Sequence, residues 1–129
     1  MPKILNILLF LCLLPHYLYA QTLPEEGRVL HYRIIGFSLP VPSWGVSKYT
    51  IDIAAGNFND YTLFNKNIIK SAFSKNNKII AEVPSFGAQY TWRITYKTAD
   101  KGELKYSELR HFSTGNVPGV DTNLVRVKI

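Results

Sequence analysis

Tyr90 to Lys97, which reads YTWRITYK, is the stretch that decides the fold class of this 129-residue chain. A large apolar side chain occupies every second position, and threonine, arginine or lysine fills the positions between them. Because side chains of a β-strand point alternately to opposite faces, the pattern predicts a strand with one continuous apolar face. The residues of that face are Tyr90, Trp92, Ile94 and Tyr96, and those of the other face are Thr91, Arg93, Thr95 and Lys97.

A turn and a partner strand follow this segment. Residues 100–102 (DKG) place a glycine where a tight turn needs a positive φ. Leu104 to Thr114 (LKYSELRHFST) is then expected to return as one antiparallel strand, since a short glycine-containing loop joins strands in this way. We also expect Arg93 and Arg110 to flank each other across the hairpin. Glu108 is expected to lie between them, because directly opposed like charges are unfavourable in a sheet.

The upstream half also reads as short strands separated by turn residues. Lys48 to Ala54 alternates cleanly, with Tyr49, Ile51 and Ile53 on one face and Lys48, Thr50 and Asp52 on the other. Two further strands are predicted over Val29–Phe37 and Lys78–Val83. Residues 57–78 are ambiguous, and we expect a short edge strand there with an exposed turn at 75–77. No segment shows the apolar period of an ordinary helix, so the chain is predicted to be an all-β sandwich or barrel.

The first 20 residues are expected to be a signal peptide. Lys3 supplies a positive charge, and the apolar run from Ile4 to Leu14 is shorter than the roughly 18 residues that a membrane-spanning helix needs. Ala20 is a small residue at the expected cleavage site, so the mature chain would begin at Gln21 with no transmembrane segment. An uncleaved signal anchor is the alternative. Cys12 is the only cysteine, and cleavage would leave no thiol for disulfides or thiolate metal sites.

Charge and export together limit the partner classes. The formal net charge is +6, from 15 lysines and arginines against 9 aspartates and glutamates, and the cations are spread along the chain. An exported basic domain could meet acidic polysaccharide, sulfated glycan or anionic lipid, although an ordinary solvated surface gives the same composition. No nucleic-acid-binding motif is present, so nucleic acid is not expected as a partner. The chain lacks an N-x-S/T sequon, which favours a bacterial protein of the periplasm, the cell surface or the medium.

Several motifs together resemble a family. The run from Val83 to Ile94 (VPSFGAQYTWRI), then Gly102, then Ser107 to Thr114 (SELRHFST) resembles the last third of a bacterial fibronectin type III domain. The resemblance implies a two-sheet antiparallel β-sandwich of the fibronectin type III or immunoglobulin-like type over residues 28–114. It also implies a tyrosine corner at Tyr90, whose hydroxyl bonds back to the preceding loop. The expected core residues are Tyr49, Ile51, Ile53, Val83, Tyr90, Trp92, Ile94 and Phe112.

Residues 115–129 are expected to be a linker and the start of a further strand, which would make the chain a fragment of a longer protein. The alternative is that this strand pairs with an edge of the sandwich itself. Val120 to Arg126 (VDTNLVR) resembles the N-terminal region of exported bacterial arylsulfate sulfotransferase-like proteins, in which a β-propeller follows and carries catalysis. That resemblance implies a following domain of the same protein as a partner, with the catalytic residues outside this chain.

No complete catalytic site is visible in the sequence. His31 and His111 are isolated, no metal-ligand spacing or G-x-S-x-G turn is present, and we expect neither a metal nor a cofactor. Asp52 and Glu82 could form a glycosidase pair only if they faced each other, and solvated positions are the simpler interpretation.

Trp44 lies in a predicted loop near Tyr49, and the two could stack on a sugar ring or an aromatic ligand. The alternative is that Trp44 caps the open end of the core. The sequence therefore favours a non-catalytic exported interaction or spacer module. An accessory domain of a sulfotransferase-like enzyme is the alternative function.

Overall fold

The computed structural model describes residues 22–116. The predicted signal peptide and Cys12 lie outside the described residues, as do the predicted strand beyond residue 116 and the sulfotransferase-like motif. In the part that is described, no helix has both the length and the apolar character needed to cross a membrane.

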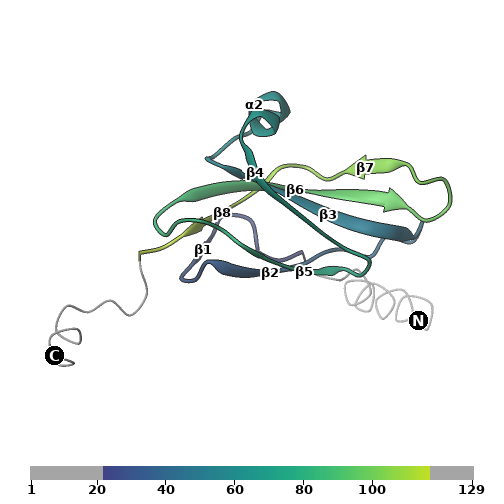
Figure 1. Ribbon diagram of the computed structural model, residues 1–129, viewed down its shortest axis with the longest axis horizontal. Coiled ribbons are helices and arrows are strands. Elements are labelled where there is room, and N and C mark those ends of the chain that lie inside the picture. The colour runs from purple at the N-terminus through teal and green to yellow at the C-terminus, as the bar shows by residue number, and fades with distance from the viewer. Residues whose placement is uncertain (1–21, 117–129) are drawn as a thin grey trace, which may run out of the picture.

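The chain is mostly β-structure and forms two sheets, which confirms the predicted all-β class (Figure 1). The larger sheet has the order β1 (Arg28–Leu30), β8 (Arg110–Thr114), β6 (Gln89–Thr98), β3 (Val46–Ala55) and β4 (Ile68–Ser74), with β7 (Leu104–Tyr106) also paired to β6. The smaller sheet consists of β2 (Ile34–Ser38) and β5 (Lys78–Glu82). The strand pairs are antiparallel except β1 with β8, which is parallel and so departs from the expected all-antiparallel arrangement.

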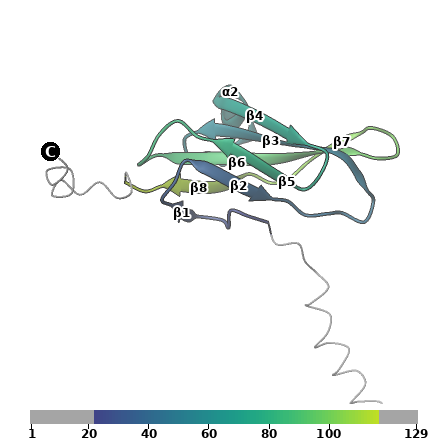
Figure 2. The ribbon, with the colours of Figure 1, turned by 60° about the horizontal axis from the view of Figure 1, so that its bottom comes forward.

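The two sheets pack face to face around one apolar core. Figures 1 and 2 show β2 and β5 on one side of the larger sheet and α2 (Tyr61–Lys66) on the other. We call the side facing β2 and β5 the inner face and the opposite side the outer face. Phe37 of the smaller sheet packs edge-on against Trp92 of the larger one, with ring centroids 4.8 Å apart. All the expected core residues are buried, namely Tyr49, Ile51, Ile53, Val83, Tyr90, Trp92, Ile94 and Phe112.

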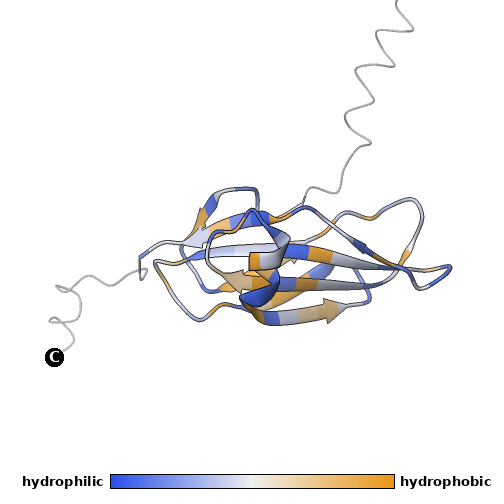
Figure 3. Cartoon of the chain, turned by 90° about the horizontal axis from the view of Figure 1, so that it is seen from above, coloured by the Kyte–Doolittle hydropathy of each residue, from blue (hydrophilic) through white to orange (hydrophobic). Residues whose placement is uncertain are grey.

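Alternation along the central strands produces this packing. Hydrophobic and hydrophilic residues follow one another along the strands in Figure 3. In β6 the residues predicted for the apolar face are all buried. The outer face of the same strand is not uniformly exposed, because Thr91 is completely enclosed and its hydroxyl donates a hydrogen bond to the carbonyl oxygen of Gly56.

Two of the predicted strands are each divided in two. The segment predicted as a single strand over Val29–Phe37 forms β1 and β2, which belong to different sheets. Between them the chain bends, and the carbonyl oxygen of Arg33 accepts a hydrogen bond from the backbone N–H of Val83. The segment predicted as one strand over Leu104–Thr114 forms β7 and β8, whose registers against β6 differ by one residue. Between β7 and β8, the Ser107 hydroxyl accepts a hydrogen bond from the backbone N–H of Ile94, so a side chain replaces a backbone carbonyl as the acceptor.

Residues 57–78 contain the expected edge strand and also a helix that was not predicted. β4 lies at the edge of the larger sheet, and an exposed turn at 75–77 follows it. The helix α2 begins after Asp60, whose side chain accepts a hydrogen bond from the N–H of Thr62 and caps the first turn. Phe64 is buried, and the Tyr61 hydroxyl donates to the carbonyl oxygen of Ser107. These contacts hold α2 on the outer face of the larger sheet, next to the site described below.

Candidate functional site

An open groove of about 290 Å³ lies on the outer face of the larger sheet, beyond the end that α2 covers. We call it the outer groove, and its lining residues are Lys48, Thr50, Thr95, Lys97, Gly102 and Leu104. They come from β3, from β6, from the turn after β6 and from β7. The groove is therefore built on paired strands, which hold its side chains in a fixed order.

Strand register explains why these residues meet. β3 pairs with β6 so that Lys48 lies opposite Lys97 and Thr50 lies opposite Thr95. On the far side of β6, β7 places Leu104 opposite Lys97. Since alternate residues share a face, the two lysines and the two threonines form adjacent rows on the outer face.

Exposed aromatic side chains stand at both ends of the threonine row. Phe73 of β4 is the register partner of Thr50, and Tyr106 of β7 is the register partner of Thr95. The exposed fraction is 71% for Phe73 and 55% for Tyr106. Strands in a sheet are about 4.8 Å apart, so three strand spacings separate the backbone positions of the two residues across the face by roughly 14 Å.

The lysines of the groove have no carboxylate partner. Within residues 22–116, every arginine takes part in an ion pair, with a carboxylate of Glu25, Glu82, Asp52 or Glu108, whereas no lysine does. The Lys48 ammonium group lies 4.5 Å from the centroid of the Phe73 ring. Directly opposed like charges destabilise a strand pair. The Lys48–Lys97 pair is therefore a local source of positive charge that the fold does not neutralise.

An ion pair closes the end of the groove toward α2. Arg93 donates to the Asp52 carboxylate over 2.9 Å, and the exposed fractions of the two side chains are only 12% and 13%. The Ser71 hydroxyl donates to the other carboxylate oxygen over 2.6 Å, and the Thr95 hydroxyl is 3.4 Å from the first. The Arg93 guanidinium also lies 4.7 Å from the centroid of the Tyr106 ring. Asp52 is thus neutralised locally, so it does not offset the charge of the two lysines.

Asp52 and Glu82 do not form a carboxylate pair. Asp52 points to the outer face of the larger sheet, whereas Glu82 is on β5 of the smaller sheet, where it pairs with Arg33 over 3.4 Å. The two carboxylates could not act on one glycosidic bond, since such a pair must flank the scissile bond. The expectation of solvated positions is wrong for Asp52, because Arg93, Ser71 and Thr95 enclose its side chain.

Trp44 and Tyr49 are not brought together as a stacking pair. Trp44 is 42% exposed in the loop before β3 and lies edge-on to Tyr96, while Lys105 lies 5.2 Å from its ring centroid. Tyr49 is 3% exposed and contacts another part of Tyr96, and burial raises the pKa of its hydroxyl. The expected ligand contact through Tyr49 is therefore ruled out by its position in the core. Trp44 both covers Tyr96 and keeps an exposed face.

Arg93 and Arg110 do not flank each other, contrary to the expectation from the hairpin. Arg110 is the register partner of Trp92, which faces the core, and its guanidinium lies 5.7 Å from the centroid of the Trp92 ring. Arg93 points to the opposite face of the sheet. The register change between β7 and β8 separates the two arginines. Glu108 does accompany Arg110, at 3.6 Å.

His111 joins three segments of the chain. Its Nδ1 lies 2.7 Å from a carboxylate oxygen of Glu26, and its Nε2 lies 2.7 Å from the carbonyl oxygen of Phe58. Partial burial by itself would lower the pKa of His111, but the hydrogen bonds to Phe58 and Glu26 outweigh it and raise that pKa. His31 is exposed and shares no site with His111. Residues 22–116 contain no group of three histidine, cysteine, aspartate or glutamate side chains that could hold a metal ion.

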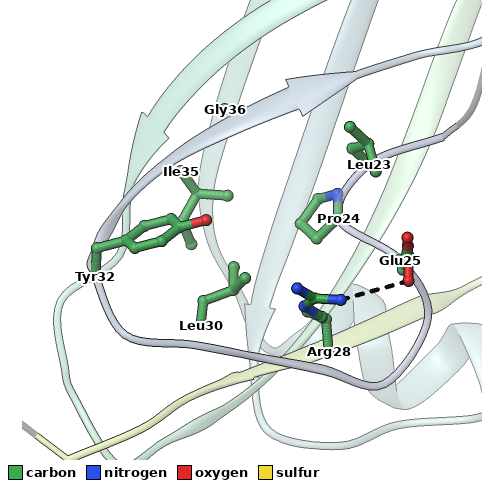
Figure 4. Close-up of a pocket in the computed structure, with 8 residues that line it drawn as sticks. All are labelled: Leu23, Pro24, Glu25, Arg28, Leu30, Tyr32, Ile35 and Gly36. Carbon is green, nitrogen blue, oxygen red and sulfur yellow. Dashed lines mark ion pairs between the residues drawn. The ribbon is translucent and has the colours of Figure 1, made fainter.

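A smaller cavity of about 190 Å³ lies between the segment before β1 and the edge of β2 (Figure 4). Leu30, Tyr32 and Ile35 supply apolar surface, and an ion pair between Arg28 and Glu25 lies at one side. Figure 4 shows these side chains around the cavity, with the Glu25 carboxylate paired to Arg28. The outer groove, which is lined by two lysines and two threonines, is therefore the better candidate for a binding site.

No family model matches this chain, and a search of curated proteins also finds no match.

Proposed function

We propose that this chain is a non-catalytic interaction module of an exported protein, with a β-sandwich of the fibronectin type III-like type. In this proposal the outer groove is its binding surface. The observation that carries it is that Lys48 and Lys97 are register partners and that neither has an ion-pair partner among residues 22–116.

The strand order supports the fibronectin-like type. In immunoglobulin-like sandwiches, strands B and E lie together in one sheet, and C, F and G follow one another in the other. Here β2 pairs with β5, and the order β3, β6 and β8 has the same connectivity as C, F and G when the strands are lettered along the chain and β7 and β8 count as the two parts of one divided strand G.

Tyr90 supplies a second, independent support. It lies near the start of β6, at the position where such domains place the tyrosine corner on strand F. Its hydroxyl donates to the carbonyl oxygen of Ser85 over 3.1 Å and accepts from the N–H of the same residue over 3.0 Å. The hydroxyl thus ties the start of the strand back to the preceding loop.

The lysine pair is easier to explain by binding than by folding. Charges of the same sign at paired positions of two strands lower the stability of the sheet. Proteins keep such unfavourable arrangements where function requires them. Arginines in the described part are used differently, since each is paired with a carboxylate within the fold. Unpaired, opposed lysines beside a groove are suited to an external anion.

Export of the protein is a proposal from the sequence of residues 1–20. N-terminal sequencing of the protein after secretion from a bacterial host tests it, with Gln21 as the expected first residue. Recovery of the chain only in the membrane or cytosol, with Met1 retained, would contradict export by a cleaved signal. The accessory-domain alternative depends on Val120 to Arg126, which lie outside the described residues, and it stays a prediction.

The proposed function is tested by the thermal stability of Lys97→Gln. Relief of the like-charge pair is expected to raise Tm by about 1–8 °C at low salt, from a pair energy of about 0.2–1 kcal/mol. The gain should fade at about 1 M salt, where charges are screened beyond roughly 3 Å. Lys70→Gln is the matched control, because Lys70 is also an exposed lysine of this sheet but its register partner is Ile53. A lower Tm for Lys97→Gln than for this control at low salt would show that Lys97 stabilises the fold, against the proposal.

A further inference from the structure

We propose that the outer groove binds an anionic polysaccharide, one that carries sulfate or carboxylate groups along its chain. This inference rests on the proposed function and specifies the ligand class of the same surface.

The first argument for this ligand is the positive charge of the two lysines in the groove. Lys48 and Lys97 are register partners whose side chains extend to opposite sides, that of Lys48 over the Phe73 ring and that of Lys97 toward Gly102, so their ammonium groups can bind two successive anionic groups of one chain. Each ammonium offers three donors and no acceptor, which suits sulfate and carboxylate oxygens. A ligand without negative charge would leave both ammonium groups without an ion-pair partner.

The floor of the groove gives the second step. Thr50 presents a hydroxyl group that can donate and accept hydrogen bonds. Thr95 is largely buried and its hydroxyl donates its one hydrogen to the Asp52 carboxylate over 3.4 Å, so it can act toward a ligand only as an acceptor. Sugar hydroxyls are also both donors and acceptors, so a polar floor between charged and aromatic side chains matches a saccharide.

The flanks give the third step. Phe73 and Tyr106 stand at the two ends of the threonine row and are exposed. The C–H face of a sugar ring can pack against an exposed aromatic ring, because both surfaces are apolar. The two backbone positions are roughly 14 Å apart, three strand spacings, which is long enough for more than one sugar unit. Positive charge in the middle and aromatic rings at the ends therefore favour an extended anionic glycan over a single small anion.

Acidic residues beside the groove argue against a lipid surface. The turn between β6 and β7 carries the exposed residues Asp100 and Glu103. Hydrogen bonds from the Lys101 N–H and Thr98 lower the pKa of Asp100, which keeps it ionised. Because Gly102 and Leu104 line the groove on either side of Glu103, these carboxylates limit how much negative charge a ligand can bring to Lys97, which favours a chain with spaced anionic groups over the continuous charge of an anionic bilayer.

The experiment measures binding by calorimetry against four probes. They are a heparin oligosaccharide as the sulfated ligand, an oligogalacturonate as the carboxylated ligand, a dextran oligosaccharide as the neutral control, and phosphatidylglycerol vesicles. We expect saturable binding of one or both anionic oligosaccharides and none of dextran. The variant with Lys48→Gln and Lys97→Gln should bind about tenfold more weakly or worse, which is the order expected for the loss of two charge-assisted contacts. Lys70→Gln should stay within about twofold of the wild type, because a single distant charge acts only through the screened field.

Phe73→Ala is a second variant that keeps both lysines. Phe73 is 71% exposed, so the substitution leaves the core intact, and it should weaken the anionic oligosaccharide without creating affinity for dextran. A loss of binding free energy in Lys70→Gln that is half as large as in the double lysine variant, or larger, would overturn the proposal, since attraction would then follow the number of charges removed and not their position. Binding only to vesicles, or to none of the probes, would also overturn it. One combination of results separates the two proposals. If Lys97→Gln has a higher Tm but neither anionic oligosaccharide binds, the ligand class is rejected, whereas the proposal that the outer groove is a binding surface is not.

Discussion

Lys48 of β3 lies directly opposite Lys97 of β6 on the outer face of the larger sheet, and neither ammonium group has an ion-pair partner among residues 22–116. Arg93 lies on the same face and is held by Asp52 and two aromatic rings. One face of one sheet thus contains a cation that the fold neutralises and two that it does not. That difference separates residues that stabilise the module from residues available to a ligand.

Trp92 is expected to be the largest single contributor to the core. It is completely buried and packs edge-on against Phe37. Trp92→Ala should lower the free energy of unfolding by about 3–5 kcal/mol, because it removes the ring and leaves a cavity. Denaturant unfolding measures this change. Trp44→Ala is the control, since that ring is 42% exposed and should cost much less. Equal costs for the two variants would contradict the assignment of Trp92 as the core anchor.

Tyr90→Phe tests the tyrosine corner. The substitution keeps the buried ring and removes the two hydrogen bonds between the hydroxyl and the Ser85 backbone. Loss of about 1–2 kcal/mol in the free energy of unfolding is expected, since the Ser85 N–H loses its partner in a partly buried place. Tyr61→Phe removes one hydroxyl bond at a side chain that is 45% exposed and should cost less. An unchanged unfolding midpoint for Tyr90→Phe would remove this support for the fibronectin-like type.

Stability is expected to depend on pH through Glu26 and His111. Both ring nitrogens of His111 lie beside acceptor oxygens, and only the protonated ring can donate to both. Burial raises the pKa of Glu26, but the hydrogen bonds from His111 outweigh it and the pKa is lowered. The pKa of His111 is raised by Phe58 and Glu26 against burial and the nearby Arg110.

The sign of each shift sets the pH window. The His111 contribution is complete below its ordinary value of 6.5 and is lost as pH rises through its raised pKa. The Glu26 contribution is complete above its ordinary value of 4.5 and is lost as pH falls through its lowered pKa. The Tm difference between the wild type and His111→Gln should therefore be largest between pH 4.5 and 6.5 and decrease on both sides. A difference that stays the same well below pH 4.5 and well above pH 6.5 would contradict the paired titration.

Local alternation made the central strands predictable from the sequence. The stripe of Tyr90, Trp92, Ile94 and Tyr96 depends only on residues two apart, and so does the burial of Ile51 and Ile53 in β3. The divided strands depend on distant partners. Leu30 and Arg33 accept hydrogen bonds from Gly115 and Val83 respectively, and nothing within residues 29–37 indicates these contacts.

The helix and the groove were missed for different reasons. α2 is a six-residue helix, which is too short to show a 3.6-residue period, although Asp60 was an available capping signal. The alternation had already assigned Lys48 and Lys97 to polar faces of their strands. Their meeting depends on the register between β3 and β6, and register between strands far apart in the sequence is set by packing of the whole sheet.

The most direct test of the binding surface is two-dimensional NMR of the isotope-labelled protein during titration with a sulfated oligosaccharide. We expect the backbone amide shifts to concentrate at Lys48, Thr50, Thr95, Lys97 and Leu104, which line the outer groove. Shifts that concentrate instead around Trp44, or along β2 and β5, would contradict the claim that this module binds through the outer face of its larger sheet.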